Sequence, residues 1–288
     1  MRGHGASIAG TGGHLLVGAV VVVLVVGACG AGASPSAVSV PDRVKAAGTL
    51  VWCSDTTYPP FESVAADGTT PEGLDIDIAE EIARRWGVTK DVRATSWDAL
   101  LNDLNAGKCD LVISSMTSTF RSRADQADFV DYLKTWLAFL VAPGNPEAIH
   151  APEDLAGRSV AVAPGLASEA ALRAASDDLV AAGKPPIEII TTTHSDEYWA
   201  EELVAGRVDA LAGDSVEVVY QAGKPPYAGA SEVGGPAIDP QPIGIAIRKD
   251  DAGMKEAVAA AIDAMYADGT MQSIVENWSM TDAVELLQ

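Results

Sequence analysis

The sequence predicts an α/β protein built from two lobes. From Val40 onward, short apolar runs typical of strands alternate with amphipathic helical segments, which is the pattern of α/β architecture. Residues 101–115 and 200–214 repeat one layout of helix, glycine and strand. The chain has 288 residues, enough for two domains that each have their own core.

Residues 1–28 have the pattern of a signal peptide that is removed on export. Arg2 and the amino terminus form a short positive region, and residues 15–28 are an unbroken apolar run of 14 residues. A bilayer-spanning helix needs about 20 residues, so this run is too short to span one. No other segment of the sequence is apolar and long enough to cross a membrane.

Cys29 follows the apolar run directly. The sequence Val26-Gly27-Ala28-Cys29 resembles a lipobox in which Cys29 is the acylated first residue of the mature chain. The alternative is an ordinary signal peptide with a cleavage site beside a cysteine. Residues 29–40 are rich in glycine, alanine, serine and proline, which predicts a flexible tether. We therefore expect a lipid-anchored protein on the extracytoplasmic face of the cell membrane.

The mature chain is strongly acidic. Without residues 1–28, 18 lysines and arginines (19 − 1) face 40 aspartates and glutamates, a net charge of −22 (18 − 40). This charge disfavours nucleic acid as a ligand and docking on anionic lipid by charge alone. We expect no nucleic-acid partner, and the acyl chain would hold the protein at the membrane.

The first predicted strand, at residues 50–54, ends beside a rigid aromatic turn. Asp55 follows the strand, an aromatic and proline-fixed turn occupies residues 58–61, and an amphipathic helix is predicted at residues 75–86. In an open α/β sheet, ligands bind outside the carboxyl ends of the strands. Asp55 and Tyr58 are therefore candidates for one wall of a small-molecule site. An ordinary βα unit with a proline-rich turn would also explain this pattern.

Each copy of the repeat is a helix ended by glycine, then a basic residue, then a strand that begins with aspartate. Gly107 and Gly206 lie where a left-handed helix cap is expected. Ser115 and Asp214 occupy equivalent positions at the carboxyl edges of the two strands. Helix–glycine–strand units are common in α/β proteins, but the matching aspartates and basic residues favour two similar lobes that face one cleft.

The predicted lobe 1 comprises residues 41–136 and 244–288, and the predicted lobe 2 comprises residues 137–243. The chain is expected to cross between them at residues 136–141 and again at residues 243–249. Two crossings form a hinge, and closure of a hinge around a ligand is an established motion of binding proteins.

Hydroxyl side chains gather after the strand of the first repeat, at residues 114–119, and Arg121 and Arg123 come next. Hydroxyls and backbone amides at a strand end can bind a small polar ligand, and the planar fork of an arginine can bind a carboxylate through two hydrogen bonds. The alternative for an arginine outside such a site is a surface ion pair with Asp125 or Asp128.

Two further segments are predicted to face the cleft. In lobe 2, a strand at residues 159–163 leads through Gly165 to a helix that is expected to begin near Ser168, its predicted N-cap. A simple helix cap would explain Ser168 as well. In lobe 1, Trp97 follows the predicted N-cap Ser96 and would either present its aromatic face to a ligand or belong to the core.

Residues 55–79, 114–129 and 205–214 resemble the family 3 solute-binding proteins, the amino-acid receptors of ATP-binding-cassette importers. The resemblance extends over nearly all of residues 41–280. It implies the periplasmic-binding-protein type 2 fold, with two α/β lobes joined by two hinge crossings. It also implies capture of a polar amino acid, or a similar small zwitterion, and its delivery to an ABC permease in the membrane.

The resemblance leaves two candidates for the arginine that binds the ligand's α-carboxylate. Arg123 has the family's distance to Phe129, but one residue too many separates it from Thr119. Arg121 departs from the pattern in the other direction, and we favour Arg123.

The resemblance assigns Asp214 to the ligand's α-ammonium and Trp97 to stacking on the ligand. The family's Gly–Thr-rich loop in lobe 2 is represented here only by Gly165 and Ser168. The predicted ligand-binding residues are Asp55, Tyr58, Trp97, Ser114, Ser115, Thr117, Arg123, Gly165, Ser168 and Asp214.

Cys53 and Cys109 remain after the lipidated cysteine is set aside. Export makes a disulfide between them possible, and members of the family that look similar to this chain often carry such a pair. The alternative is two buried thiols out of reach of each other, because the ends of their strands are offset.

The sequence contains no catalytic, metal or cofactor signature. Without residues 1–28 only His150 and His194 remain, isolated from each other, so no zinc cluster is predicted. There is no Gly-x-Ser-x-Gly elbow, no phosphate loop and no Gly-x-Gly-x-x-Gly turn after a strand. We expect a monomeric binding protein without a cofactor, and acidic surroundings that favour a neutral or basic ligand.

Two other functions remain open at this point. Some family members that this chain resembles are dehydratases of cyclohexadienyl acids, a reaction that needs a general acid in the cleft. Asp55, Glu62 and Asp214 are the acids that the sequence offers there, and binding would explain each of them. A ligand sensor on the extracytoplasmic face is the second alternative.

Overall fold

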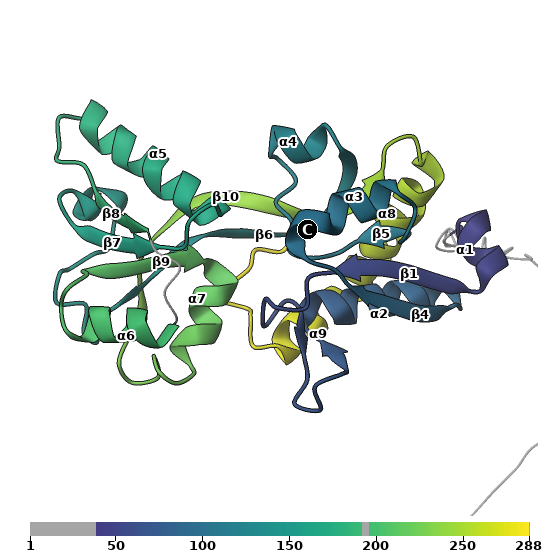
Figure 1. Ribbon diagram of the computed structural model, residues 1–288, viewed down its shortest axis with the longest axis horizontal. Coiled ribbons are helices and arrows are strands. Elements are labelled where there is room, and N and C mark those ends of the chain that lie inside the picture. The colour runs from purple at the N-terminus through teal and green to yellow at the C-terminus, as the bar shows by residue number, and fades with distance from the viewer. Residues whose placement is uncertain (1–38, 192–195, 288) are drawn as a thin grey trace, which may run out of the picture. The chain divides into compact units, whose positions relative to one another are not determined.

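A long antiparallel strand pair, β6 (Ala127–Val141) and β10 (Glu232–Arg248), lies at the centre of the fold (Figure 1). The computed structural model describes residues 39–191 and 196–287, and the predicted signal peptide, Cys29 and most of the tether lie outside them. Among the described residues, the main sheet has the strand order β4-β1-β5-β10-β6-β9-β7-β8. Within the same ranges, no helix is long and apolar enough to cross a membrane.

The strand pair β6 and β10 connects two lobes (Figure 1). At one end, Val130 pairs with Ile245 and Ala246 pairs with Val112 of the neighbouring strand. At the other end, Val141 pairs with Glu232 and with Ala210. The register between β6 and β10 shifts three times along the way. Such irregularities bend strands and interrupt the ladder, and they make these two crossings a natural place for a hinge.

Lobe 1 contains the amino-terminal elements and the two last helices. Its elements are α1 (Asp42–Ala47), β1 (Thr49–Ser54), β2 (Ser63–Val64), β3 (Pro71–Glu72), α2 (Leu74–Trp86), β4 (Thr89–Ala94), η1 (Trp97–Ala99), α3 (Leu100–Asn105), β5 (Leu111–Val112), α4 (Arg121–Ala124), α8 (Ala252–Ala267) and α9 (Thr270–Asn277). Trp52 and Phe61 are fully buried in its core.

Lobe 2 contains the middle of the chain and buries a core of its own. Its elements are η2 (Pro152–Leu155), β7 (Ser159–Val162), α5 (Ala167–Ala181), β8 (Glu188–Thr191), α6 (Asp196–Val204), β9 (Ala210–Asp214) and α7 (Ser215–Ala222). Phe139 and Leu155 are fully buried in this core. Both lobes thus have the α/β composition that the alternating sequence pattern predicts.

The helix predicted at residues 75–86 is present as α2 and starts one residue earlier. Its apolar residues recur at helical spacing and are buried against the sheet, among them Leu74, Ile78 and Ile82. Gly73 precedes it with φ 144°, and a Cβ there would lie 2.0 Å from the carbonyl oxygen of Phe61. The aromatic turn and the start of α2 therefore pack too closely for any residue but glycine.

The internal repeat is present in atomic detail. Asp110 and Asp209 directly precede the equivalent strands β5 and β9, and the carboxylate of each accepts a backbone N–H from the adjacent strand, from Val51 at 3.0 Å and from Ser159 at 2.8 Å. The basic residue of each copy pairs with an acid five residues earlier, Lys108 with Asp103 and Arg207 with Glu202, both at 2.7 Å. The two copies are the same structural unit, one in each lobe.

Ser168 is not the N-cap of its helix, contrary to the sequence-based expectation. Helix α5 begins at Ala167, and its N-cap is Leu166, whose backbone is extended at φ −95° and ψ 169°. Glu169 instead reaches back and accepts the Gly165 N–H at 2.7 Å. This bond fixes the loop that leads into the helix, while the helix itself has no side-chain capping hydrogen bond at its N-cap.

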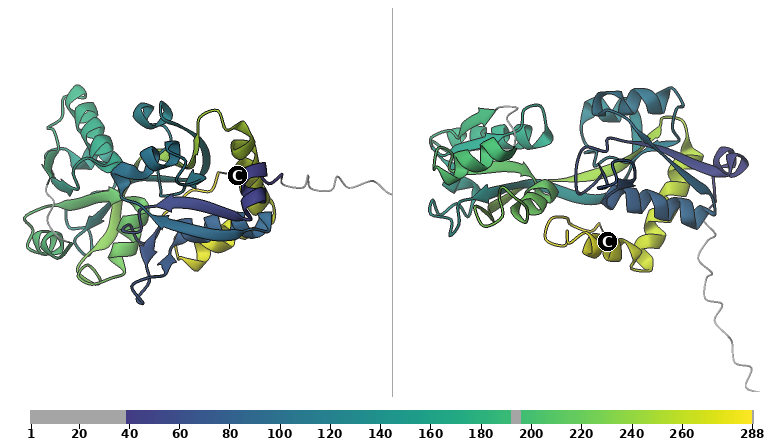
Figure 2. Two further views of the ribbon diagram at one scale, coloured as in Figure 1. Left: turned by 45° about the vertical axis from the view of Figure 1, so that its right-hand side comes forward. Right: turned by 60° about the horizontal axis from the view of Figure 1, so that its bottom comes forward.

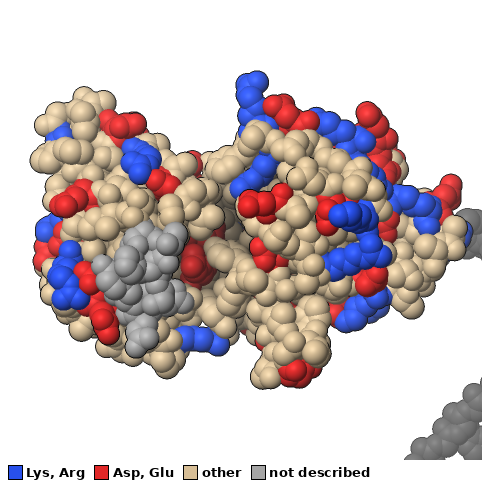
Figure 3. Space-filling view, viewed as in Figure 1, with Lys and Arg blue, Asp and Glu red and all other residues tan. Residues whose placement is uncertain are grey.

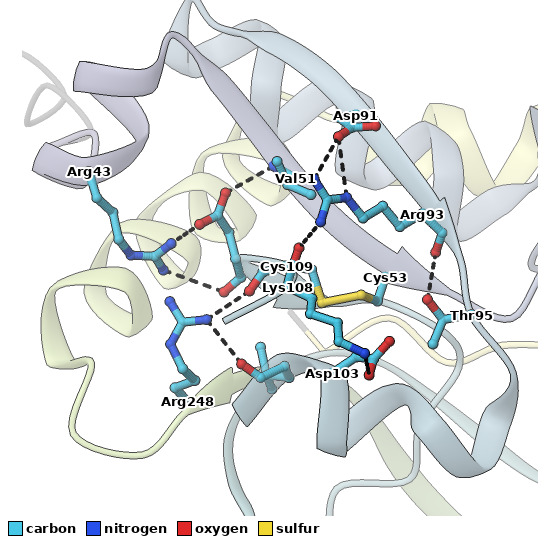
Figure 4. Close-up of a disulfide and its surroundings, with 12 residues drawn as sticks. Arg43, Val51, Cys53, Asp91, Arg93, Thr95, Asp103, Lys108, Cys109 and Arg248 are labelled. Carbon is cyan, nitrogen blue, oxygen red and sulfur yellow. Dashed lines mark hydrogen bonds and ion pairs between the residues drawn. A yellow bond between two sulfur atoms is a disulfide. The ribbon is translucent and has the colours of Figure 1, made fainter. Parts of the chain in front are cut away.

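Cys53 and Cys109 form a disulfide that joins the end of β1 to the start of β5 (Figure 4). The alternative of two buried thiols out of reach of each other is wrong, since the Cα atoms of the two cysteines lie only 5.8 Å apart. Arg248 supports the same place by donating to the Cys109 carbonyl at 2.7 Å. Both cysteines are buried.

The carboxyl-terminal segment passes beside the crossings, close to both lobes (Figure 2). Lys134 of β6 and Glu285 exchange two backbone hydrogen bonds, at 2.9 and 3.0 Å. The buried hydroxyl of Ser215, the first residue of α7, donates to the Ala283 carbonyl at 2.5 Å. This segment therefore contacts one crossing strand and the first residue of a lobe 2 helix.

Candidate functional site

A cavity of about 300 Å³ lies between the two lobes. Figure 3 shows a hollow between them with acidic side chains inside it. The residues that line the cavity are Asp55, Thr57, Tyr58, Glu62, Trp97, Ser115, Thr117, Arg123, Leu166, Ala167, Ser168 and Asp214. Three acids and one base are among them. The cavity therefore suits a ligand that carries a positively charged group and also a carboxylate that the arginine can bind.

Eight of the ten predicted ligand-binding residues line this cavity. Ser114 does not, because it is fully buried and bridges Glu62 and the Asp55 N–H from behind. Gly165 does not line it either, since it is exposed and its N–H is bound by Glu169. The lining residues that the prediction omitted are Thr57, Glu62, Leu166 and Ala167.

Asp55 organises the lobe 1 wall of the cavity. One carboxylate oxygen accepts the Trp97 backbone N–H at 2.9 Å, and the other accepts the Thr57 hydroxyl at 2.7 Å. Asp55 thus caps the short helix η1, whereas the side chain of Ser96 makes no capping hydrogen bond. Trp97 is 37% exposed, which places it at the cavity rather than in the lobe 1 core.

Arg123 is fixed with its guanidinium in the cavity. The group lies over the rings of Trp97, at 5.1 Å, and Phe120, at 4.7 Å, and donates to the Thr117 carbonyl at 3.0 Å. Burial lowers the pKa of Arg123. Arg121, one residue into the same short helix, is exposed and does not line the cavity. Aromatic stacking leaves part of the guanidinium fork directed at whatever occupies the site.

Asp214 enters the cavity from lobe 2. It ends β9 and is the N-cap of α7, where its carboxylate accepts the Val216 N–H at 3.1 Å. The Thr135 hydroxyl of the crossing strand β6 supplies a second hydrogen bond. Burial nevertheless raises the pKa of Asp214 to about 6. A carboxylate whose charge is disfavoured by burial gains most from a cation placed against it.

Tyr58 connects the lobes. Its ring stacks on Phe61 with the centroids 6.0 Å apart, and its hydroxyl donates to the Glu217 carboxylate of α7 at 3.5 Å. Glu217 lines an adjoining cavity of about 320 Å³ in lobe 2, which shares Leu166 and Ser168 with the cavity between the lobes. Burial and the neighbouring Glu217 raise the pKa of Tyr58 well above its usual value.

The arrangement is suited to binding a small zwitterion. One fixed guanidinium and one half-buried carboxylate come from opposite lobes, and hydroxyls and aromatic faces surround the space between them. Within residues 39–191 and 196–287, no group of three or more metal-ligating side chains could hold a metal ion.

Comparisons with known proteins agree with this geometry. Residues 50–281 match the family model of bacterial extracellular solute-binding proteins, family 3. The L-cystine-binding protein TcyJ of Escherichia coli (strain K12) is 30% identical over 245 residues, which cover 85% of this chain and 87% of that protein. The histidine-binding periplasmic protein of Salmonella typhimurium is 30% identical over 230 residues, covering 78% and 85% of the two chains.

A solved structure is similar as well. The ancestral cationic amino acid solute binding protein superposes with a TM-score of 0.68 at 31% identity, over 82% of this chain and 98% of that one. These findings confirm the resemblance and the periplasmic-binding-protein type 2 fold that it implies. The chain belongs to the bacterial extracellular solute-binding proteins of family 3.

Proposed function

We propose that this protein captures a polar α-amino acid, or a similar small zwitterion, between its lobes and delivers it to an ABC importer. The observation that carries the proposal is the presence of Arg123 and Asp214 in one cavity, drawn from opposite lobes. Arg123 binds the α-carboxylate, with help from Ser115 and Thr117, and Asp214 binds the α-ammonium. Tyr58 and Trp97 cover the remainder of the ligand.

The acids of the site support a neutral or basic side chain on the ligand. Asp55 and Asp214 line the same cavity as Arg123, and Glu217 lies within hydrogen-bonding distance of Tyr58. An acidic side chain would approach several carboxylates for one guanidinium, and like charges at short distance repel. The relatives named for histidine, cystine and cationic amino acids agree with this preference.

The relatives named above are binding proteins, which supports a carrier role without chemistry. We propose that the mature chain is a monomer held to the extracytoplasmic face of the membrane through an acylated Cys29. Replacing Cys29 by serine should release the protein or leave its precursor unprocessed, as seen by membrane fractionation and mass spectrometry. Normal processing together with retention at the membrane would show that the anchor lies elsewhere.

The first experiment is a thermal-shift screen of the purified protein against the twenty amino acids, ornithine, citrulline and L-cystine. Binding to the folded state raises the melting temperature with ligand concentration. The strongest hit is then titrated by calorimetry. A protein that shows no shift and no heat with any of these compounds does not bind α-amino acids, and the proposal fails.

The clamp is tested with a matched pair of arginine variants. Arg123→Ala removes the proposed carboxylate ligand, whereas Arg121→Ala removes an exposed arginine of the same helix. Truncating one partner of a buried charge pair costs roughly 2–5 kcal/mol, so Arg123→Ala should weaken binding by about 30-fold to several thousand-fold. Arg121→Ala should stay within a few-fold of wild type. Equal losses in both variants would remove Arg123 from this role.

Asp214→Ala provides the reciprocal test. It should weaken binding of the intact amino acid over the same range while largely sparing an analogue that lacks the α-amino group. A variant that binds the intact amino acid within a few-fold of wild type would mean that Asp214 does not hold an α-ammonium.

A further inference from the structure

Two carboxyl groups lie in contact beneath the site, where the clamp does not use them. Glu62 and Asp75 are 1% and 0% exposed, the Asp75 N–H donates to the carbonyl of Phe61, the residue before Glu62, at 2.9 Å, and the two carboxyl groups interact with each other. Two carboxylates in contact in a buried place cannot both be ionised, so such a pair holds one proton between them. No described residue forms an ion pair with either of them.

The surroundings decide which of the two carries the charge. One oxygen of Asp75 accepts the Ser115 N–H at 2.6 Å, and the other accepts the Tyr132 hydroxyl at 2.6 Å. Glu62 accepts from the Ser114 hydroxyl at 2.7 Å, while its second oxygen is buried and accepts no hydrogen bond from any described residue. Asp75 therefore receives more hydrogen bonds than Glu62. Since these bonds stabilise a negative charge, Asp75 is ionised and Glu62 carries the proton.

Each member of the pair holds a loop that forms the cavity. Ser114 donates to Glu62 and accepts the Asp55 N–H at 3.0 Å, so Glu62 fixes the end of β1 through one hydroxyl. Asp75 binds the N–H of Ser115, whose backbone has φ 42°. A non-glycine residue in this region is strained and persists where its surroundings hold it. A charged acceptor at 2.6 Å is a strong means of holding it.

We propose that Glu62 and Asp75 are positioning residues that share one proton and hold the Asp55 and Ser115 loops in the shape that binds the ligand. This inference rests on the proposed function for its effect on affinity, but not for the shared proton. Neither residue is expected to grip the ligand's charged groups.

The groups that face the pair come from several elements. Asp55 and Tyr58 lie in the loop after β1, Tyr132 in β6, and Arg123 across the same cavity. Burial, then the neighbouring Asp75, raises the pKa of Glu62 well above its usual value. A carboxyl group with a raised folded-state pKa stabilises the fold below its unfolded-state pKa, and the contribution is lost as pH rises through the folded-state pKa.

The shared proton is tested without any ligand, by melting wild type and Glu62→Gln between about pH 5 and about pH 8. A glutamine amide donates to Asp75 at every pH and still accepts from Ser114. The melting temperature of wild type should therefore fall more steeply with rising pH than that of E62Q. Burial also raises the pKa of Asp75, to about 6, and Asp214 contributes a fall of the same sign to both proteins, so the difference between the two profiles reports the Glu62–Asp75 pair as a unit. Parallel profiles would overturn the shared proton.

Positioning is tested by affinity for the amino acid that binds wild type most tightly in the screen. Asp75→Asn removes the charge and leaves one acceptor oxygen for two donors, so its amide protons face either the Ser115 N–H or the Tyr132 hydroxyl. It should weaken binding by about 10- to 100-fold, the range seen when residues that orient metal ligands are removed. Glu62→Ala should also weaken binding, and E62Q should restore most of the loss.

Tyr132→Phe is the matched control, because it removes the donor to the other oxygen of Asp75, away from Ser115. It should lower the melting temperature as D75N does while leaving affinity within a few-fold of wild type. Folded D75N with unchanged affinity, or equal affinity losses in D75N and Y132F, would overturn the positioning role. A wild type that binds no amino acid contradicts the proposed function instead, and the melting profiles still decide the shared proton.

Discussion

The side chain of Asp214 both caps helix α7 and lines the cavity between the lobes. Two donors stabilise its carboxylate, yet burial outweighs them and raises its pKa to about 6. The residue is therefore poised to ionise against a cation. Helix capping alone would account for an aspartate at this position. Its raised pKa and its place in the cavity also suit it to the proposed binding of an α-ammonium.

The raised pKa of Asp214 predicts how affinity depends on pH. Only the carboxylate attracts an ammonium group, and a bound cation lowers the pKa of Asp214 below its value in the empty site. Affinity should therefore be complete above about pH 6 and decline as pH falls below it. Calorimetric titrations at several pH values check this, and Asp214→Asn should lack the decline. Affinity that rises on acidification would contradict the role given to Asp214.

Residue types at strand ends allowed much of the site to be predicted. Asp55, Arg123 and Asp214 follow strands or short loops at the cleft, and all three line the cavity. Ser114 shows the limit of this reasoning, because Ser114 and Ser115 lie beyond the end of β5, where the turn with φ 42° at Ser115 sets the directions of the side chains. The sequence could not indicate that Ser114 turns inward to Glu62 while Ser115 faces the cavity.

At the scale of elements, local signals were reliable where glycine ends a helix. Gly107 and Gly206 have φ 71° and 66° and close the two matching helices as predicted. The full lengths of β6 and β10 were not predicted, because a continuous strand pair depends on partners far apart in sequence. The predicted N-cap of α5 was wrong as well, since the helix begins at Ala167 and its N-cap is Leu166, with no side-chain capping hydrogen bond.

The disulfide is the element-scale feature with the clearest effect on stability. Cys53 and Cys109 are 56 residues apart, and closing a loop of that size restricts the unfolded chain by roughly 4 kcal/mol in the chain-entropy model. The double variant Cys53→Ala/Cys109→Ala should lose roughly 2–5 kcal/mol in free energy of unfolding. Urea denaturation of the oxidised wild type, the reduced wild type and the variant measures this. Equal stability of all three would contradict it.

At the scale of the whole molecule, the repeated unit and the two crossings account for the function together. Each lobe presents one copy of the repeat, and the copies lead to Ser115 in lobe 1 and Asp214 in lobe 2. The crossings have shifted register, and the carboxyl-terminal segment is hydrogen-bonded to one of them at Lys134. A ligand that contacts both lobes would stabilise their closed arrangement. Binding would therefore shift the protein toward a more compact shape.

In the proposed complex, one small zwitterion bridges Arg123 of lobe 1 and Asp214 of lobe 2. The most direct test is solution X-ray scattering of the protein with and without a saturating amount of the amino acid identified by the screen. The radius of gyration should decrease when the ligand is bound, because the bridged lobes close. Tight binding confirmed by calorimetry in the same buffer, with no decrease in the radius of gyration, would contradict it.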